Sequence, residues 1–207
     1  MTRTLIHPAS PHRRDVAIVA GLLVLLFAAV SWFVRLTQYK SVPGPSASAP
    51  LRWPSASALR REAGLPTLVL FAHPKCPCTS ASLSELRAAL SGFGGRVQAI
   101  VAFSAPVGAE RDWQTTGAWQ AAREIPGVVT VLDPDGAETA RFGAKTSGHV
   151  VLYGAEGALL FSGGITASRG HEGDNPGRER VRALLEDPRA PGGKTPVFGC
   201  ELVEVMR

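Results

Sequence analysis

Residues 66–90 read PTLVLFAHPKCPCTSASLSELRAAL, and they join two different patterns. The first seven residues form a continuous apolar run, which is typical of a strand buried on both faces of a sheet. Apolar residues then recur at helical spacing at Leu83, Leu86 and Leu90. Ser82 with Glu85 fits a capping box at the start of this helix. The stretch therefore predicts a buried strand followed by a helix, with Cys76 and Cys78 at the junction.

Further strands and helices are predicted after this unit. The patterns indicate strands over 96–103, 128–132, 149–153 and 158–161, helices over 112–124 and 177–186, and an irregular link through Phe142. The alternation of strands and helices at the start implies right-handed parallel crossovers. The glycine-bounded turn at 154–157 indicates an antiparallel hairpin between the last two strands. We therefore expect an α/β domain with a central mixed sheet flanked by helices.

An uncharged apolar segment, VAIVAGLLVLLFAAVSWFV, occupies residues 16–34. As a helix, its 19 residues span about 28 Å, close to the roughly 30 Å hydrocarbon core of a bilayer. The segment is longer than the roughly 7–15 apolar residues of a signal peptide, so we predict a single retained transmembrane helix. Arg3, Arg13 and Arg14 precede it and favour a cytoplasmic N-terminus. We expect a single-pass protein of the inner membrane whose C-terminal domain is periplasmic.

The net charge of the chain comes mostly from the region around this segment. The formal charge is +5, and residues 1–40 hold five basic residues against Asp15 alone, a net +4. The other 167 residues are nearly neutral, with 17 basic and 16 acidic side chains. A domain without a strong positive field lacks the electrostatic footprint of a nucleic-acid-binding protein, so we expect no nucleic-acid partner.

The chain divides into five predicted segments. They are an N-terminal cytoplasmic tail at 1–15, the transmembrane helix at 16–34, a Pro/Ser/Ala-rich linker at 35–58, a folded domain at 59–187, and a C-terminal tail at 188–207 that carries Cys200.

The two cysteines of His73–Cys78 (HPKCPC) lie where a helix begins. Unpaired backbone N–H groups and the positive end of the helix dipole stabilise an anion there. A thiolate is such an anion, and Lys75 adds a positive charge, so the sequence predicts a reactive thiol with a lowered pKa. The alternative is a pair of buried, inert cysteines.

Several features together resemble the membrane-tethered thioredoxin-like proteins of bacterial envelopes. The features are the Cys pair after a buried strand, the element order, VVTVLDPDG at 128–136, RFGAKTSGHVVLYGAEG at 141–157, and the N-terminal anchor. Within that family the chain resembles the RedB-like group, and it is distantly similar to TlpA- and ResA-type thiol-disulfide oxidoreductases. The resemblance covers residues 57–187 and implies a thioredoxin-like fold with a redox site at the helix start.

Three positions depart from the family pattern. The family motif is Cys-x-x-Cys, whereas this chain has Cys76-Pro-Cys78. The family's cis-proline position is matched by Gly148, and the aromatic residue before the first cysteine by Lys75. These departures leave the direction of electron flow and the substrate open. A bridge over one intervening proline would be strained and easily reduced, which is typical of an oxidant or an isomerase more than of a reductant.

The resemblance implies roles for these residues. Cys76 would be the attacking thiolate and Cys78 the resolving thiol of a thiol-disulfide oxidoreductase that needs no cofactor. The backbone around Ser147, Gly148 and His149 would position the substrate. The implied partners are thiol- or disulfide-bearing envelope proteins.

A copper-binding or delivery module is the alternative function. Two thiolates spaced Cys-x-Cys present two soft sulfur ligands to Cu(I). The third ligand would be His149 or His171. His73 is as compatible with a loop histidine that orients the backbone as with a ligand.

The loop after the last predicted strand is expected to border the site, and the role of Cys200 stays open. Arg169 and His171 belong to the polar stretch SRGHEGDN at 168–175, which is either a contact surface for a partner or an ordinary solvated loop. Cys200 has three interpretations: a resolving thiol that reaches Cys76 or Cys78, a third metal ligand, or a buried free cysteine.

Overall fold

The structure is a computed structural model, and it describes residues 11–45, 48–106 and 110–202. The chain forms two compact units, Met1–Tyr39 and Lys40–Arg207. Most of the predicted tail at 1–15, including Arg3, and the last five residues of the tail at 188–207 lie outside the described residues.

The first unit is dominated by the helix α1 (Pro11–Ser41), which contains the predicted apolar segment 16–34. Its part from Arg14 to Ser41 is long and apolar enough to cross a membrane, by length and composition. The helix fits a single-pass anchor. It also extends into the predicted linker 35–58, because no proline or glycine interrupts the chain between residue 34 and Pro43.

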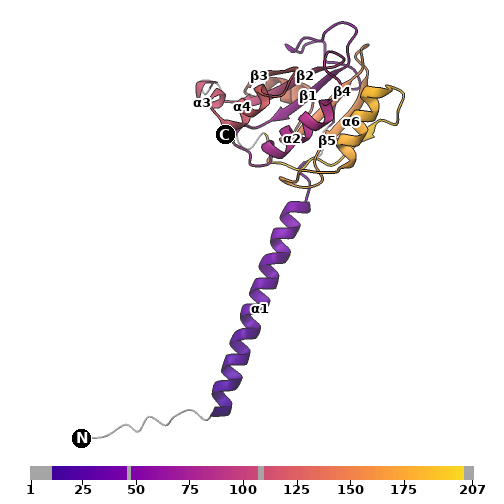
Figure 1. Cartoon of the computed structure of the whole chain (residues 1–207). Coiled ribbons are helices and arrows are strands. Elements are labelled where there is room, and N and C mark those ends of the chain that lie inside the picture. The colour runs from indigo at the N-terminus through magenta and orange to yellow at the C-terminus, as the bar shows by residue number, and fades with distance from the viewer. Residues whose placement is uncertain (1–10, 46–47, 107–109, 203–207) are drawn as a thin grey trace, which may run out of the picture. The chain divides into compact units, whose positions relative to one another are not determined.

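The second unit is built on a six-stranded mixed sheet with the strand order β3-β2-β1-β4-β5-β6 (Figure 1). Three parallel strands form one half: β1 (Thr67–Ala72), β2 (Gln98–Ala105) and β3 (Val128–Pro134). The antiparallel hairpin β4 (His149–Tyr153) and β5 (Leu159–Gly164) extends the other half, with the short β6 (Gly193–Lys194) at its edge. All six residues of β1 are buried, as its continuous apolar run predicts.

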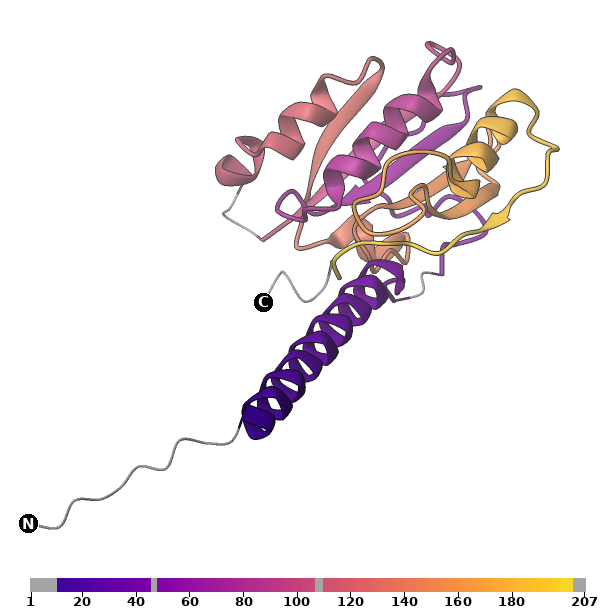
Figure 2. The same cartoon turned by 60° about the horizontal axis from the view of Figure 1, so that its bottom comes forward.

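Helices cover one face of this sheet. Figure 2 shows α2 (Thr79–Leu90), α4 (Gly117–Arg123) and α6 (Pro176–Glu186) lying across it. Alternate strand residues such as Leu70 and Phe103 join apolar side chains of these helices in the larger core cluster. The intervening residues, such as Phe71, face a smaller cluster on the opposite side, which includes Trp53 and Leu202. The predicted mixed sheet flanked by helices is therefore confirmed.

Several elements differ from the sequence prediction. The helix predicted over 112–124 is two helices, α3 (Glu110–Gln114) and α4, because the Thr116 side chain caps α4 by accepting from the Trp119 backbone N–H. The predicted irregular link contains the short helix α5 (Ala137–Arg141).

The predicted capping box is wrong. The first residue of α2 is Thr79 and Cys78 stands at its N-cap, so Ser82 and Glu85 lie inside the helix. The Ser82 hydroxyl donates back to the Cys78 carbonyl oxygen at 3.4 Å.

Candidate redox site at the start of α2

Cys76 and Cys78 lie in the turn that connects β1 to α2, as predicted. The Cys76 N–H donates to the His73 carbonyl oxygen at 3.0 Å, and the Thr79 N–H donates to the Cys76 carbonyl oxygen at 3.0 Å. These bonds fold the two cysteines into a tight turn. Cys76 is buried, with 5% of its surface exposed, whereas Cys78 is only partly buried.

The thiol that contacts Cys76 comes from the C-terminal tail. The sulfur atoms of Cys76 and Cys200 are 2.9 Å apart and hydrogen-bonded, although the two residues are separated by 124 positions in the chain. All three cysteines of the protein are free. Of the three interpretations of Cys200, the geometry matches a thiol that reaches back to Cys76.

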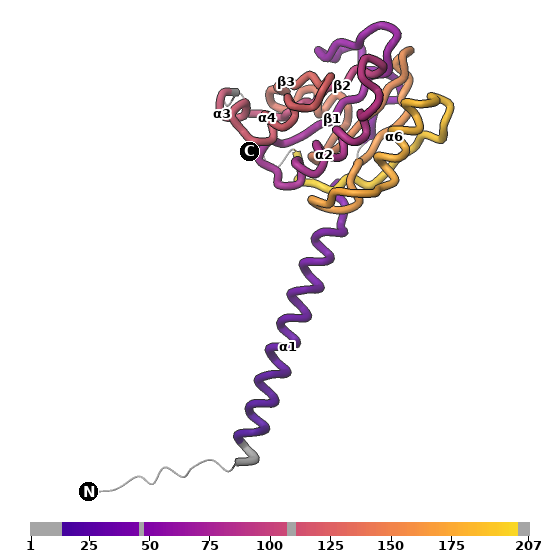
Figure 3. The backbone as a smooth tube through the Cα atoms, in the orientation of Figure 1, coloured from indigo at the N-terminus to yellow at the C-terminus, as the bar shows by residue number. Residues whose placement is uncertain are grey.

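Backbone pairing holds the tail in this place. The Ser147 N–H donates to the Cys200 carbonyl oxygen at 2.8 Å, and the Leu202 N–H donates to the Lys145 carbonyl oxygen at 2.9 Å. An isolated antiparallel bridge joins Thr146 and Glu201. Figures 1 and 3 show the yellow C-terminal segment returning from α6 along the side of the domain where α2 begins.

The surroundings make Cys76 the most acidic of the three thiols. Burial alone would raise the pKa of Cys76, but hydrogen bonds from the Cys200 thiol, the backbone of Cys200 and Cys78, and the Ser147 side chain lower it below its ordinary value. Burial and then the charge on Cys76 raise the pKa of Cys78. Burial and the hydrogen bond to Cys76 raise the pKa of Cys200 to about 12. Cys76 is therefore the first of the three thiols to lose its proton, and Lys75 is not among the groups that lower its pKa.

We predict that the donor at position 200 controls this pKa. With Cys78 replaced by alanine in all variants, Cys200→Ala should raise the pKa of Cys76 because the ionised sulfur loses a hydrogen bond. Cys200→Ser keeps a donor and should raise it less. The pH dependence of Cys76 alkylation by iodoacetamide measures the change, and equal pKa values in the two variants would contradict the assignment.

The segment predicted to position a substrate lies directly against the cysteine turn. The Ser147 hydroxyl oxygen accepts from the His73 N–H at 3.0 Å and lies 3.1 Å from the Thr79 hydroxyl. Gly148 donates its N–H to the Phe71 carbonyl oxygen at 2.8 Å and adopts a φ of +93°. A Cβ there would lie 2.8 Å from the Ser82 hydroxyl oxygen. Only glycine meets both conditions, which explains why no proline stands at this position.

His149 is directed elsewhere. Its Nε2 lies 2.8 Å from the Ser162 hydroxyl oxygen, and the ring is fully buried. With Lys194 and Thr195 it lines a cavity of about 370 Å³ beside β5. Within residues 11–45, 48–106 and 110–202, no three His, Cys, Asp or Glu side chains form a metal-binding group. The alternative ligand set of Cys76, Cys78 and His149 or His171 is therefore not assembled in the described structure.

Burial of His149 predicts a pH-dependent stability. Burial lowers the pKa of His149 from 6.5 to about 4, so between these values the unfolded state binds a proton that the folded state does not. The contribution is fully present above pH 6.5 and is lost as the pH falls to 4, an effect of about 3 kcal/mol. His73, whose pKa is lowered by burial and by Lys75, acts in the same direction.

Urea unfolding of the full chain at pH 7 and pH 4.5 measures this effect. The variant His149→Gln should show a smaller difference between the two pH values. An equal difference in the variant would contradict the prediction.

His73 and Lys75 form one side of the site together with Trp113. The His73 ring makes an edge contact with the Trp113 ring at 5.0 Å between centroids, and its Nδ1 accepts from the Lys75 N–H at 3.2 Å. The Lys75 ammonium lies 4.5 Å from the centre of the Trp113 ring. Trp113 could not be predicted from the sequence, because nothing in its neighbourhood indicates that α3 packs against the cysteine turn.

The loop 168–175 supplies the opposite side. The Arg169 guanidinium donates to the Gly199 carbonyl oxygen, and its charge acts to lower the pKa values of Cys78 and Cys200. Arg169 thus lies beside Cys78 and Cys200. His171 lies in the exposed part of this loop.

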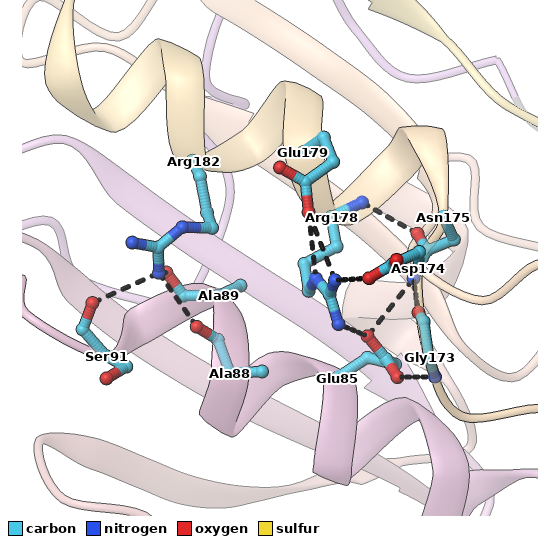
Figure 4. Close-up of polar contacts among 10 residues, drawn as sticks. All are labelled: Glu85, Ala88, Ala89, Ser91, Gly173, Asp174, Asn175, Arg178, Glu179 and Arg182. Carbon is cyan, nitrogen blue, oxygen red and sulfur yellow. Dashed lines mark hydrogen bonds and ion pairs between the residues drawn. The ribbon is translucent and has the colours of Figure 1, made fainter.

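A buried ion pair fastens this loop to α2 (Figure 4). The Glu85 carboxylate accepts from the Gly173 N–H, from the Asn175 side-chain amide at 3.1 Å and from the Arg178 guanidinium at 2.7 Å. Asp174, one of the charges of the predicted contact surface, pairs with Arg178 at 2.9 Å. Glu85 therefore ties the loop to the helix and does not cap it.

Comparison with known proteins finds similar structures but does not assign the chain to a family. No protein-family model and no curated protein matches the chain. An uncharacterized conserved protein from Geobacillus kaustophilus is similar in structure, with a TM-score of 0.56 and 18% identity over 79% of this chain and 90% of that one. A hypothetical protein from Sinorhizobium meliloti 1021 is similar at a TM-score of 0.56 and 17% identity, over 78% and 94% of the two chains.

A weaker similarity links the chain to the exposed lipoprotein thioredoxin of Streptococcus pneumoniae. Its TM-score is 0.45, with 16% identity over 60% of this chain and 85% of that one. The arrangement of the chain itself is the one the sequence predicted: a β1-α2-β2 crossover, an antiparallel β4-β5 hairpin followed by α6, and a cysteine at the start of α2. The second unit has a thioredoxin-like fold.

Proposed function

We propose that this protein is a membrane-tethered thiol-disulfide oxidoreductase whose redox pair is Cys76 and Cys200. The observation that carries the proposal is the 2.9 Å contact between the two sulfur atoms, combined with the lowered pKa of Cys76 and the raised pKa of Cys200. A nucleophilic thiolate beside a protonated thiol is the arrangement that dithiol exchange requires.

The exchange proceeds in two displacements. In the first, the Cys76 thiolate attacks one sulfur of a partner disulfide, the partner S–S bond breaks, and one partner sulfur leaves as a thiolate. In the second, Cys200 loses its proton to that thiolate or to solvent and attacks the Cys76 sulfur. The second partner sulfur leaves, and a Cys76–Cys200 disulfide remains. Two electrons pass from the protein to the partner, and the reverse sequence oxidises a partner dithiol.

Cys78 receives a different place in this scheme from the one the resemblance implies. Its thiol is more exposed than that of Cys76 and has a raised pKa, so it does not compete as the attacking group. Only Pro77 separates Cys78 from Cys76 in the chain, so a disulfide between the two cysteines would be strained. We assign the resolving role to Cys200 because that thiol already touches Cys76.

The proposed setting is the periplasmic side of the inner membrane. The apolar helix α1 supplies the anchor, and three arginines before the apolar segment against Arg35 and Lys40 after it favour a cytoplasmic N-terminus. The partners proposed are thiol- or disulfide-bearing proteins of the envelope. The membrane tether keeps the domain at the membrane surface, where it would meet these partners.

The direct experiment follows free thiols across a glutathione redox series. The full chain in detergent is equilibrated at each potential and its free thiols are counted, in parallel with a Cu(I) titration. We expect two thiols to be lost together at oxidising potentials and to return at reducing ones, with weak Cu(I) binding. Tight stoichiometric Cu(I) binding without disulfide exchange would support the copper-delivery alternative and contradict the proposal.

A further inference from the structure

The segment Val197–Leu202 lies across the redox site like a bound peptide. Its backbone pairs antiparallel with Lys145–Ser147, the segment that stands immediately before β4, through the bonds from Ser147 to Cys200 and from Leu202 to Lys145. This pairing is the mode by which an extended peptide adds to an exposed backbone edge. The sulfur that it delivers to Cys76 occupies the position that a partner's sulfur needs in the first displacement.

The resemblance implies that the backbone around Ser147 positions the substrate. We propose that the chain's own tail occupies the backbone edge Lys145–Ser147 in place of the substrate, until an extended, cysteine-bearing segment of the partner protein displaces it. The inference rests on the proposed function and names the substrate class of the same site. In the reaction, the tail leaves the edge, the partner segment docks, and Cys76 attacks. The tail then returns with Cys200, forms the Cys76–Cys200 disulfide and releases the partner.

The contacts of the tail specify the partner segment. A Cβ on Gly199 would collide with the Ser147 carbonyl oxygen, so the residue before the partner cysteine has to be glycine. Leu202 is fully buried in the cluster that contains Phe71, Phe142 and Ala144, so the residue two positions after the cysteine has to be apolar. The site therefore selects an extended Gly-Cys-x-apolar segment.

The Arg169 guanidinium supplies one further contact. It donates to the Gly199 carbonyl oxygen, which is a backbone group that a partner segment also offers at that position. The Arg169 guanidinium and the Ser147 N–H thus bind two successive backbone carbonyl oxygens, those of Gly199 and Cys200. Both contacts are independent of the side chains of the bound segment.

The test uses capped peptides with the tail sequence as substrates. Acetyl-VFGCEL-amide is linked by a disulfide to 5-thio-2-nitrobenzoate, whose release reports attack by Cys76. The enzyme is the full chain in detergent with Cys78→Ala and Cys200→Ser, so that Cys76 is its only thiol. A second version adds Leu202→Ser, which weakens docking of the tail. Every rate is divided by the rate with the nitrobenzoate disulfide of 2-mercaptoethanol, which corrects for changes in thiol reactivity.

The expected results concern both the tail and the peptide. Leu202→Ser should raise the normalised rate with VFGCEL about tenfold, because the peptide no longer competes with the tail. In that variant VFACEL and VFGCES should each react about tenfold more slowly than VFGCEL. Leu159→Ala, which alters the same apolar cluster from β5, is the matched control and should leave the normalised rate unchanged.

The outcomes separate this inference from the proposed function. Equal normalised rates for the three peptides, or no effect of Leu202→Ser, would overturn the docking site even when Cys76 reacts with the small disulfide. Failure of Cys76 to attack the small disulfide at all would overturn the proposed function itself.

Discussion

Replacing Cys76 with serine is expected to abolish disulfide exchange, with a loss of at least about a thousandfold in rate. A serine hydroxyl is not ionised at neutral pH and cannot replace the thiolate. Neither remaining thiol compensates, because burial, the largest cause of the raised pKa values of Cys78 and Cys200, still acts when the charge on Cys76 is gone. The measurement is the initial rate of reduction of a fluorescent peptide disulfide by the full chain in detergent.

The other two cysteines provide the controls for this experiment. Cys78→Ser should retain most of the rate, because Cys78 is not part of the proposed pair. Cys200→Ser should retain the first displacement and accumulate a mixed disulfide with the substrate, because the thiol that resolves it is missing. A Cys76→Ser variant with residual activity close to that of the unsubstituted chain would show that another thiol attacks.

Breaking the ion pair between Arg178 and Glu85 is expected to have the largest effect on stability. Arg178→Met should lower the free energy of unfolding by about 3–5 kcal/mol, because it leaves a buried carboxylate without its counter-charge. The exposed fractions of the two side chains are 15% for Arg178 and 4% for Glu85, so water compensates little. Urea unfolding followed by circular dichroism measures the loss.

Arg182→Met is the matched control. Arg182 belongs to the same helix α6 and donates to the carbonyl oxygens of Ala88, Ala89 and Ser91 at the end of α2 (Figure 4). Its removal leaves no buried charge, so the expected cost is about 1 kcal/mol. An equal loss of unfolding free energy in the two variants would contradict the prediction. It would mean that the Glu85–Arg178 ion pair does not stabilise the attachment of the loop 168–175 to α2.

The elements near the redox site were predictable because their patterns are local. The apolar run of β1 and the leucine spacing of α2 are short-range signals. The structure places β1 within one residue of the expected range, and α2 contains the three predicted leucines although it begins at Thr79, before the predicted cap at Ser82. Cys76 at the helix start follows from these two elements alone. The strand over His149–Tyr153 was predicted with its observed bounds for the same reason.

The contacts that define the site's chemistry are long-range and left no local signal. Cys200 reaches Cys76 only because the tail pairs with residues before β4, and no periodicity around Cys200 indicates that pairing. Glu85 matched a capping pattern by its spacing, although its partner Arg178 lies 93 residues away. The resemblance pointed to Ser147–His149, yet only the geometry shows that Ser147 contacts the cysteine turn while His149 contacts Ser162.

The most direct test of the redox pair is the disulfide that forms on oxidation. The full chain is oxidised in a glutathione buffer, blocked and digested with trypsin, which places Cys76 and Cys78 together in peptide 76–87 and Cys200 in peptide 195–207. The proposal predicts a cross-linked pair of these peptides, both in the unsubstituted chain and in Cys78→Ser. A loop within peptide 76–87, or loss of the cross-link in Cys78→Ser, would contradict the assignment of Cys76 and Cys200 as the redox pair.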